Sequence, residues 1–102
     1  MNKYRNVKTV VDNITFDSKK EAARYDYLKV LFRCRQITDF ELQKVYELKV
    51  NGIKICNYRA DFYYKDEDGK EVIEDTKGMK TPAYKLKAKL MLAIYGIRII
   101  ET

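Results

Sequence analysis

Charged residues near the ends of two neighbouring predicted strands are of the types that support metal-assisted hydrolysis. Asp75 and Lys77 stand two apart in "EVIEDTKGMK", so the two-residue period of a strand puts them on one face. Asp61 lies in "YRADFYY", on the strand that precedes the acidic turn "KDEDGK". Hairpin pairing across that turn sets Asp61 opposite a residue between Glu74 and Thr76, and the register depends on the loop type.

Two carboxylates a few ångströms apart suit Mg²⁺, a hard cation that takes oxygen ligands, and Mn²⁺ is a plausible substitute. Such an ion acidifies water and neutralises charge that builds on a phosphate. In this scheme Lys77 orients the attacking water, and the backbone carbonyl of Thr76 completes the metal ligands. The alternative is that Asp61, Glu74 and Lys77 form ordinary cross-strand ion pairs on a solvated face. Spacing alone leaves both interpretations open.

Glu21 is open to two interpretations as well. It follows Ser18 by three residues at the start of an amphipathic pattern over residues 18–34, which is the spacing of a helix capping box. The position at the beginning of a helix beside the sheet would also let its carboxylate reach a metal cluster.

Composition excludes several kinds of site. The chain has 102 residues, which predicts one domain over 1–102, and it has no histidine. Catalysis by histidine bases, Ser-His-Asp triads and histidine-bound metals is therefore excluded. A net charge of +6 indicates a polyanionic partner or merely spare lysines. The chain has neither a membrane-length apolar run nor a signal sequence, so we expect a cytoplasmic protein.

The pattern of the chain predicts an α+β fold with a mixed central sheet flanked by two helices. We expect a hairpin over 7–16, a helix over 18–34, strands in "ITDFELQ", "KVYELKV", "IKICNYRADFYY" and "EVIEDTK", a helix from Thr81 to Gly96, and a last strand over 97–100. The segment between the last two strands has the length of a crossover between parallel strands.

The order of these motifs resembles the PD-(D/E)xK nuclease superfamily, and the wider sequence from about residue 13 to 100 is similar to small phage-encoded proteins within it. The resemblance implies a restriction-endonuclease-like core and a Mg²⁺-dependent endonuclease. Asp61 and Asp75 would then be metal ligands, Lys77 would position the water, and Glu21 would be an auxiliary acid. Ala60 stands where the motif has proline. Glu74 immediately precedes Asp75, so register decides which of the two faces the metal.

Basic and aromatic residues surround these motifs. Lys80, Lys85, Lys87 and Lys89 follow the catalytic strand and could hold phosphates that flank the cut one. A solvated helix face explains the same lysines, and Gln43 is a weaker candidate for the site. Three tyrosines near Asp61 could stack on DNA, although sheet packing explains them equally well: Tyr58, Tyr63 and Tyr64.

We therefore expect a metal-dependent endodeoxyribonuclease without a nucleotide cofactor. Its expected substrate is double-stranded or branched DNA such as a Holliday junction, in phage recombination or DNA processing inside a bacterial host. A homodimer is expected because cuts on two opposed strands need two sites. The alternative is a catalytically silent DNA-binding or partner-binding module that keeps the nuclease fold. Nothing in the sequence rules out RNA as the substrate.

Overall fold

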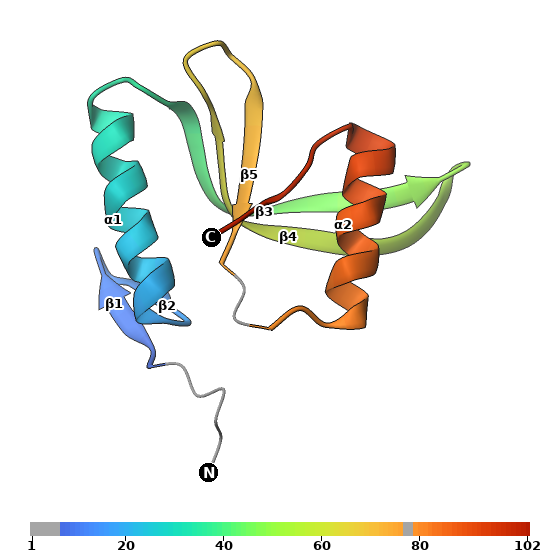
Figure 1. The fold of residues 1–102 in the computed structure, drawn as a ribbon, viewed down its shortest axis with the longest axis horizontal. Helices are drawn as coiled ribbons and strands as arrows, with labels where there is room; N and C mark the ends of the chain where they lie inside the picture. Colours follow the sequence, from blue (N-terminus) through green and yellow to red (C-terminus); the bar gives the residue numbers. More distant parts are fainter. Residues whose placement is uncertain (1–6, 77–78) are drawn as a thin grey trace.

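The computed structural model describes residues 7–76 and 79–102. These residues form an α+β fold, drawn in Figure 1. In chain order its elements are β1 (Thr9–Val11), β2 (Ile14–Phe16), α1 (Lys19–Arg33), β3 (Thr38–Val50), β4 (Ile53–Lys65), β5 (Glu71–Asp75), α2 (Pro82–Tyr95) and β6 (Ile100–Glu101). No helix within the described ranges is long and apolar enough to cross a membrane.

The main sheet is mixed, as the sequence predicts. Its strand order is β3-β4-β5-β6, with antiparallel pairing except between β5 and β6, which are parallel. β1 and β2 form a separate two-stranded sheet. The predicted last strand was wrong in its bounds, because it pairs over Ile100–Glu101 and not over 97–100. Ile97 and Ile99 pack their side chains against the core, and only Glu74 and Asp75 of β5 have a partner in β6.

Capping and turn residues set the ends of the elements. The side chain of Ser18 accepts a hydrogen bond from the backbone N–H of Glu21 and begins α1. Thr81 does the same for α2, and Gly96 ends that helix in the left-handed conformation at φ 70°. The β1–β2 turn has positive φ at Asp12 and Asn13, which matches a tight hairpin. These sequence predictions are confirmed.

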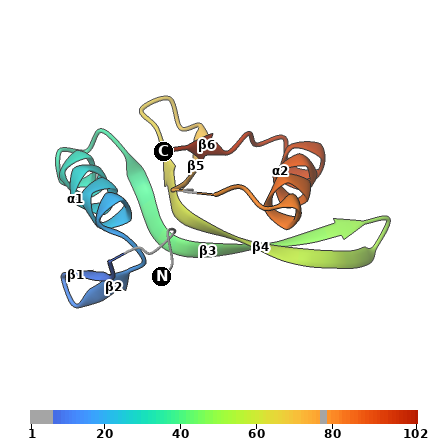
Figure 2. The same ribbon diagram turned by 60° about the horizontal axis from the view of Figure 1, so that its bottom comes forward.

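The two longest strands bend together, and the bend decides which helix each half faces. Figure 2 shows β3 and β4 turning between the part beside α1 and the part beneath α2. On β4, Ala60 belongs to the cluster that packs on α2, whereas Phe62 belongs to the cluster that packs on α1. Side chains two residues apart on a strand normally share a face, but those of Ala60 and Phe62 do not. The alternation of side chains between the two faces of β4 therefore changes phase at Asp61. Directly across on β3, Gln43 has a φ of 55°, which is uncommon for a residue other than glycine.

The bend also explains a wrong expectation about β3. The sequence predicted two strands, in "ITDFELQ" and "KVYELKV", but the structure has one continuous strand from Thr38 to Val50. The change of hydrophobic face at Gln43 looks like a strand break in the sequence. Pairing with β4 carries the backbone through it, with Leu42 opposite Phe62 and Lys44 opposite Ala60.

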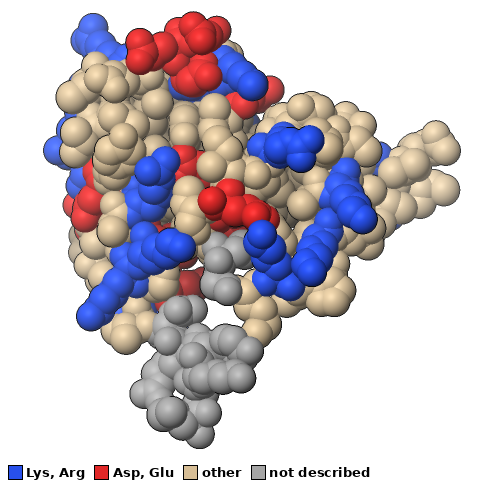
Figure 3. Space-filling model, in the orientation of Figure 1, with Lys and Arg blue, Asp and Glu red and all other residues tan. Residues whose placement is uncertain are grey.

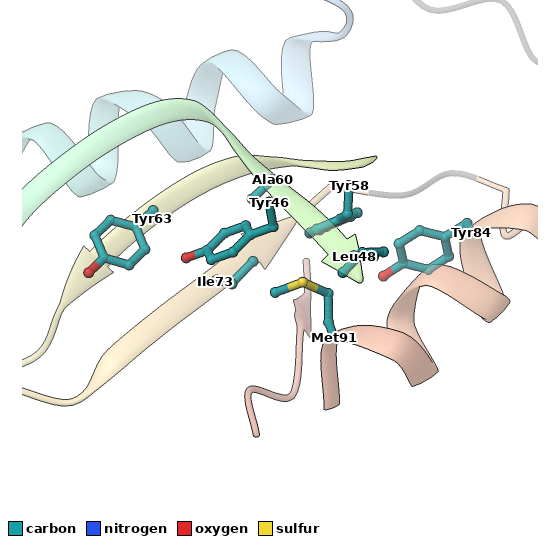
Figure 4. Close-up of a cluster of buried hydrophobic side chains, with 8 residues drawn as sticks. All are labelled: Tyr46, Leu48, Tyr58, Ala60, Tyr63, Ile73, Tyr84 and Met91. Atoms are coloured by element: carbon teal, nitrogen blue, oxygen red, sulfur yellow. The ribbon is translucent and has the colours of Figure 1, made fainter. Parts of the chain in front are cut away.

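The apolar core is divided between the two faces of the sheet. The α2 cluster is drawn in Figure 4 and consists of Tyr46, Leu48, Tyr58, Ala60, Tyr63, Ile73, Tyr84 and Met91. The α1 cluster consists of Phe16, Ala22, Tyr25, Leu28, Ile37, Phe62 and Tyr64. The two helices therefore cover opposite faces of the sheet, as predicted. Leu86 of α2 lies outside both clusters and is 55% exposed.

Truncating one leucine in each cluster tests this division. Leu28 and Leu48 are both fully buried, so we expect Leu28→Ala and Leu48→Ala each to lower the free energy of unfolding by about 2–5 kcal/mol. The exposed Leu86 provides the control, and Leu86→Ala should change it by less than about 0.5 kcal/mol. Urea unfolding followed by circular dichroism measures all three. A tolerated change at Leu28 or Leu48 would contradict the assignment of that residue to a core.

Candidate functional site

Asp61 and Asp75 meet where β4 bends and β5 ends. The β4–β5 ladder pairs Phe62 with Glu74, and one further step in this register sets Asp61 level with Asp75. The Oδ2 atom of Asp61 accepts a hydrogen bond from the backbone N–H of Thr76 at 2.9 Å. Asp75 is fully buried, and its Oδ2 accepts a hydrogen bond from the Tyr58 hydroxyl at 2.6 Å. The expected convergence of these two carboxylates is present.

The electrostatics of Asp61 reflect this crowding. Burial raises the pKa of Asp61 to about 7, and its hydrogen-bonded contact with Asp75 and the charges of Asp75 and Glu21 act in the same direction. The backbone N–H of Thr76 partly opposes this by stabilising the ionised form. Like charges on neighbouring carboxylates disfavour their joint ionisation. Carboxylate oxygens are also the ligands that a hard divalent cation prefers.

The position of Glu21 fits both roles that the sequence left open. Its backbone N–H donates to Ser18 Oγ at 3.1 Å, which caps the helix. Its side chain is 6% exposed, and its charge acts on Asp61. The first turn of α1 therefore brings a third carboxylate toward the pair. Within residues 7–76 and 79–102, however, no three acidic or cysteine side chains lie in an arrangement that would hold a metal ion.

The structure separates Glu74 from Asp75, although the two are adjacent in sequence. Glu74 is fully buried on the α1 side of the sheet. Arg24 holds it in two parallel hydrogen bonds, from Nε at 2.6 Å and Nη2 at 2.7 Å. The hydroxyl of Tyr64 also donates to Glu74. This carboxylate is therefore used in a structural ion pair, and Asp75 is the acid on the face of Tyr58.

The remaining predicted residues are distributed around the pair. Lys77 lies outside the described residues. Gln43 is exposed, and its Nε2 atom donates to Asp61 Oδ1 at 3.4 Å. The hydroxyl of Thr76 is 3.0 Å from that of Thr102, so the last residue of the chain packs beside the end of β5. Four lysines belong to α2 or the segment before it: Lys80, Lys85 and Lys89 are exposed, and Lys87 is half-buried.

The tyrosines near the site pack within the fold. Tyr58, Tyr63 and Tyr64 are all buried, so sheet packing is the interpretation that the structure supports, not stacking on DNA. Sequence analysis missed the contact of Tyr58 with Asp75, because it depends on the bend of β4 and on the register of β5. Burial and this hydrogen bond both raise the pKa of Tyr58, which keeps its proton available for Asp75.

A pocket of about 330 Å³ lies beside Glu21 and Gln43, the two residues that interact with Asp61. It is lined by Ile14, Thr15, Phe16, Asp17, Glu21, Leu42, Gln43 and Arg59. Arg59 was not anticipated. It lies two residues before Asp61 on β4, but the strand changes face at Asp61, so the two-residue period does not by itself bring the two side chains together. A larger cavity of about 640 Å³ lies at the beginning of β5, beside Val72 and Arg98, and none of the acidic site residues lines it.

The raised pKa of Asp61 predicts how metal-free stability varies with pH. The ordinary aspartate pKa is 3.8 and the folded value is about 7, so the folded state binds more protons between these values. The free energy of unfolding of the wild type, relative to Asp61→Asn, should therefore fall as pH rises from about 4 to about 7 and then level off. Urea unfolding without divalent metal measures this difference. A difference that stays constant with pH would contradict the buried carboxylate pair.

The ion pair of Arg24 with Glu74 predicts a structural effect that is separate from the acidic pair. Arg24→Ala leaves a buried carboxylate without its cation, which costs about 3–5 kcal/mol in fully buried pairs. The Arg24 side chain is 31% exposed, so we expect a loss of about 2–3 kcal/mol. Arg33→Ala, at the exposed end of the same helix, is the control and should cost less than about 0.5 kcal/mol. Equal losses of stability for Arg24→Ala and Arg33→Ala, measured by thermal unfolding, would show that the buried charge of Glu74 does not depend on Arg24.

Comparison with known proteins gives one family. No curated protein and no solved structure matches the chain. Residues 1–98 match the family model described as "Protein of unknown function (DUF1064)". This match spans nearly all of the sequence, including Glu21, Asp61 and Asp75. The chain therefore belongs to the DUF1064 family.

Proposed function

We propose that this protein is a metal-dependent endonuclease that hydrolyses DNA phosphodiester bonds, with branched DNA as the favoured substrate. The observation that carries the proposal is the contact between the half-buried Asp61 and the fully buried Asp75, with the pKa of Asp61 raised to about 7. Burying two neighbouring carboxylates is costly for a fold that does nothing with them. The resemblance to PD-(D/E)xK nucleases, in which such a pair binds metal, supports the same conclusion.

Asp61 and Asp75 would hold Mg²⁺ or Mn²⁺ between them, with the carbonyl of Thr76 as a further oxygen and Glu21 as an auxiliary acid. When bound, the ion supplies the positive charge that acidifies water and stabilises the phosphate in the transition state. Tyr58 holds Asp75 in position through the 2.6 Å hydrogen bond. The backbone N–H of Thr76 orients Asp61. Glu74 takes no part, because Arg24 already neutralises it.

Lys77 directly follows Thr76 in sequence and would orient the attacking water with its ammonium group. A compact cation on a flexible stem suits this task. The lysines of α2 would hold phosphates that flank the cut one. Lys85, Lys87 and Lys89 support this better than Lys80 does, because Lys80 is within 2.7 Å of Glu101 and so has an acidic partner already.

A homodimer in the bacterial cytoplasm is the form that we propose for cutting opposed strands of a junction. A silent nucleic-acid or partner-binding module is the competing function. The observation that favours it is that no three-residue metal cluster forms among the described residues. Metal binding separates the two functions, since a silent module should bind no Mg²⁺ at the acidic pair.

We expect purified protein with Mg²⁺ to cut a four-way DNA junction, and Asp61→Asn, Asp75→Asn and Lys77→Ala each to lower the rate by about 10²-fold or more. The loss follows from removing a metal ligand or the group that orients water. Gel assays of cleavage measure the rates, and circular dichroism checks that the variants fold.

Two controls make the cleavage test specific. Lys54→Ala changes an exposed lysine at the far tip of the β3–β4 hairpin and should cut at the wild-type rate. Calorimetry should detect Mg²⁺ binding to the wild type and its loss in Asp75→Asn. RNA and linear duplex are assayed beside the junction. A wild type that binds no divalent metal and cuts none of the three would rule out the nuclease and leave the silent module.

A further inference from the structure

Lysines without an acidic partner lie at the beginning of α1 as well as on α2. Lys19 and Lys20 are exposed at the first positions of α1, and Lys85 and Lys89 are exposed on α2. Throughout the described part of the chain, no Asp or Glu side chain forms an ion pair with any of these four. Many lysines elsewhere do have such partners: Lys8, Lys29, Lys44, Lys49 and Lys65.

The two pairs of lysines belong to elements on opposite sides of the acidic site. Lys19 and Lys20 directly precede Glu21, whose charge acts on Asp61. Lys85 and Lys89 lie on the helix that follows the end of β5. Figure 3 shows Lys and Arg atoms gathered over α1 and over α2 on the same face, with acidic atoms between them.

Uncompensated like charges at these positions are unfavourable for the protein alone. Lys85 and Lys89 are four apart on one helix, a spacing at which equal charges repel. Lys19 and Lys20 stand at the N-terminus of α1, where the helix dipole already favours anions over cations. A polyanion that lies along this face would offset both the repulsion between Lys85 and Lys89 and the unfavourable interaction of Lys19 and Lys20 with the helix dipole. Duplex DNA offers a phosphate charge for about every 1.7 Å of its axis.

We infer that duplex DNA crosses the acidic site from α1 to α2, with Lys19 and Lys20 contacting phosphates on one side of the cut position and Lys85 and Lys89 contacting phosphates on the other. This inference rests on the proposed function of the Asp61–Asp75 pair. It deepens that function, because an enzyme that grips both sides of the cut needs duplex on both sides. The protein should therefore cut at internal positions and not at DNA ends.

Salt dependence of binding tests the inference without relying on cleavage. Fluorescence anisotropy in EDTA measures affinity for a four-way junction and for a linear duplex over a series of salt concentrations. Each lost phosphate contact should reduce the slope of log affinity against log salt by about 0.9. Lys19→Ala/Lys20→Ala should therefore reduce the slope by about 2, which is roughly 30-fold weaker binding near 0.15 M salt. Lys85→Ala/Lys89→Ala should do the same.

The matched control is Lys54→Ala/Lys70→Ala. Both lysines are exposed and form no ion pair among the described residues. Lys54 lies in β4 next to the β3–β4 turn, and Lys70 lies in the β4–β5 turn. This variant should keep the wild-type slope. An unchanged slope in Lys19→Ala/Lys20→Ala, or an equal loss in the control, would overturn the inference. Hydroxyl-radical footprinting should show protection on both sides of the site, and loss of one side in each lysine variant.

The outcomes separate this inference from the proposed activity. A wild type that cuts DNA, but whose α1 lysines do not affect binding, overturns the two-sided contact alone. A wild type that binds duplex through both helices and cuts nothing, with or without metal, overturns the nuclease and leaves the two-sided contact supported.

Discussion

The rest of this fold is arranged around two neighbouring carboxylates that repel each other, the half-buried Asp61 and the fully buried Asp75. Asp61 and Asp75 come from different strands, and each is held by a neutral donor: the Thr76 backbone N–H for one and the Tyr58 hydroxyl for the other. These donors fix the side chains without cancelling the charge. Desolvation of Asp61, together with its contact with Asp75, raises the pKa of Asp61 to about 7.

The bend of β3 and β4 makes this arrangement compatible with a folded core. Along β4 the side chains alternate between the two faces of the sheet, and this alternation changes phase at Asp61. One half of the β3–β4 pair can therefore pack on α1 and the other half on α2. The backbone of Gln43 accepts an uncommon φ of 55° at the same point. Strained backbone of this kind tends to occur at functional sites, where the surrounding structure holds it in place. Here it sets the Gln43 amide against Asp61.

Adjacent acids show how the sheet assigns different roles to similar residues. Glu74 and Asp75 are both fully buried, but they point to opposite faces of β5. Glu74 meets a guanidinium and a hydroxyl, so its charge is satisfied within the protein. Asp75 meets another carboxylate. The first arrangement stabilises the contact of α1 with the sheet, whereas the second places a carboxylate of β5 beside a carboxylate of β4.

The sequence by itself determined the α+β class, the helix ends and the hairpin turns. Ser18, Thr81 and Gly96 specify helix ends through local hydrogen bonds and φ preferences, and the hairpin turns follow from Asn and Gly in the same way. Such signals act over a few residues and can therefore be read along the chain. Which face each acid takes, the continuity of β3 and the partner of Tyr58 were decided by the tertiary structure alone. They depend on the bend at Gln43 and Asp61 and on the β4–β5 register, which bring together residues that are far apart in sequence.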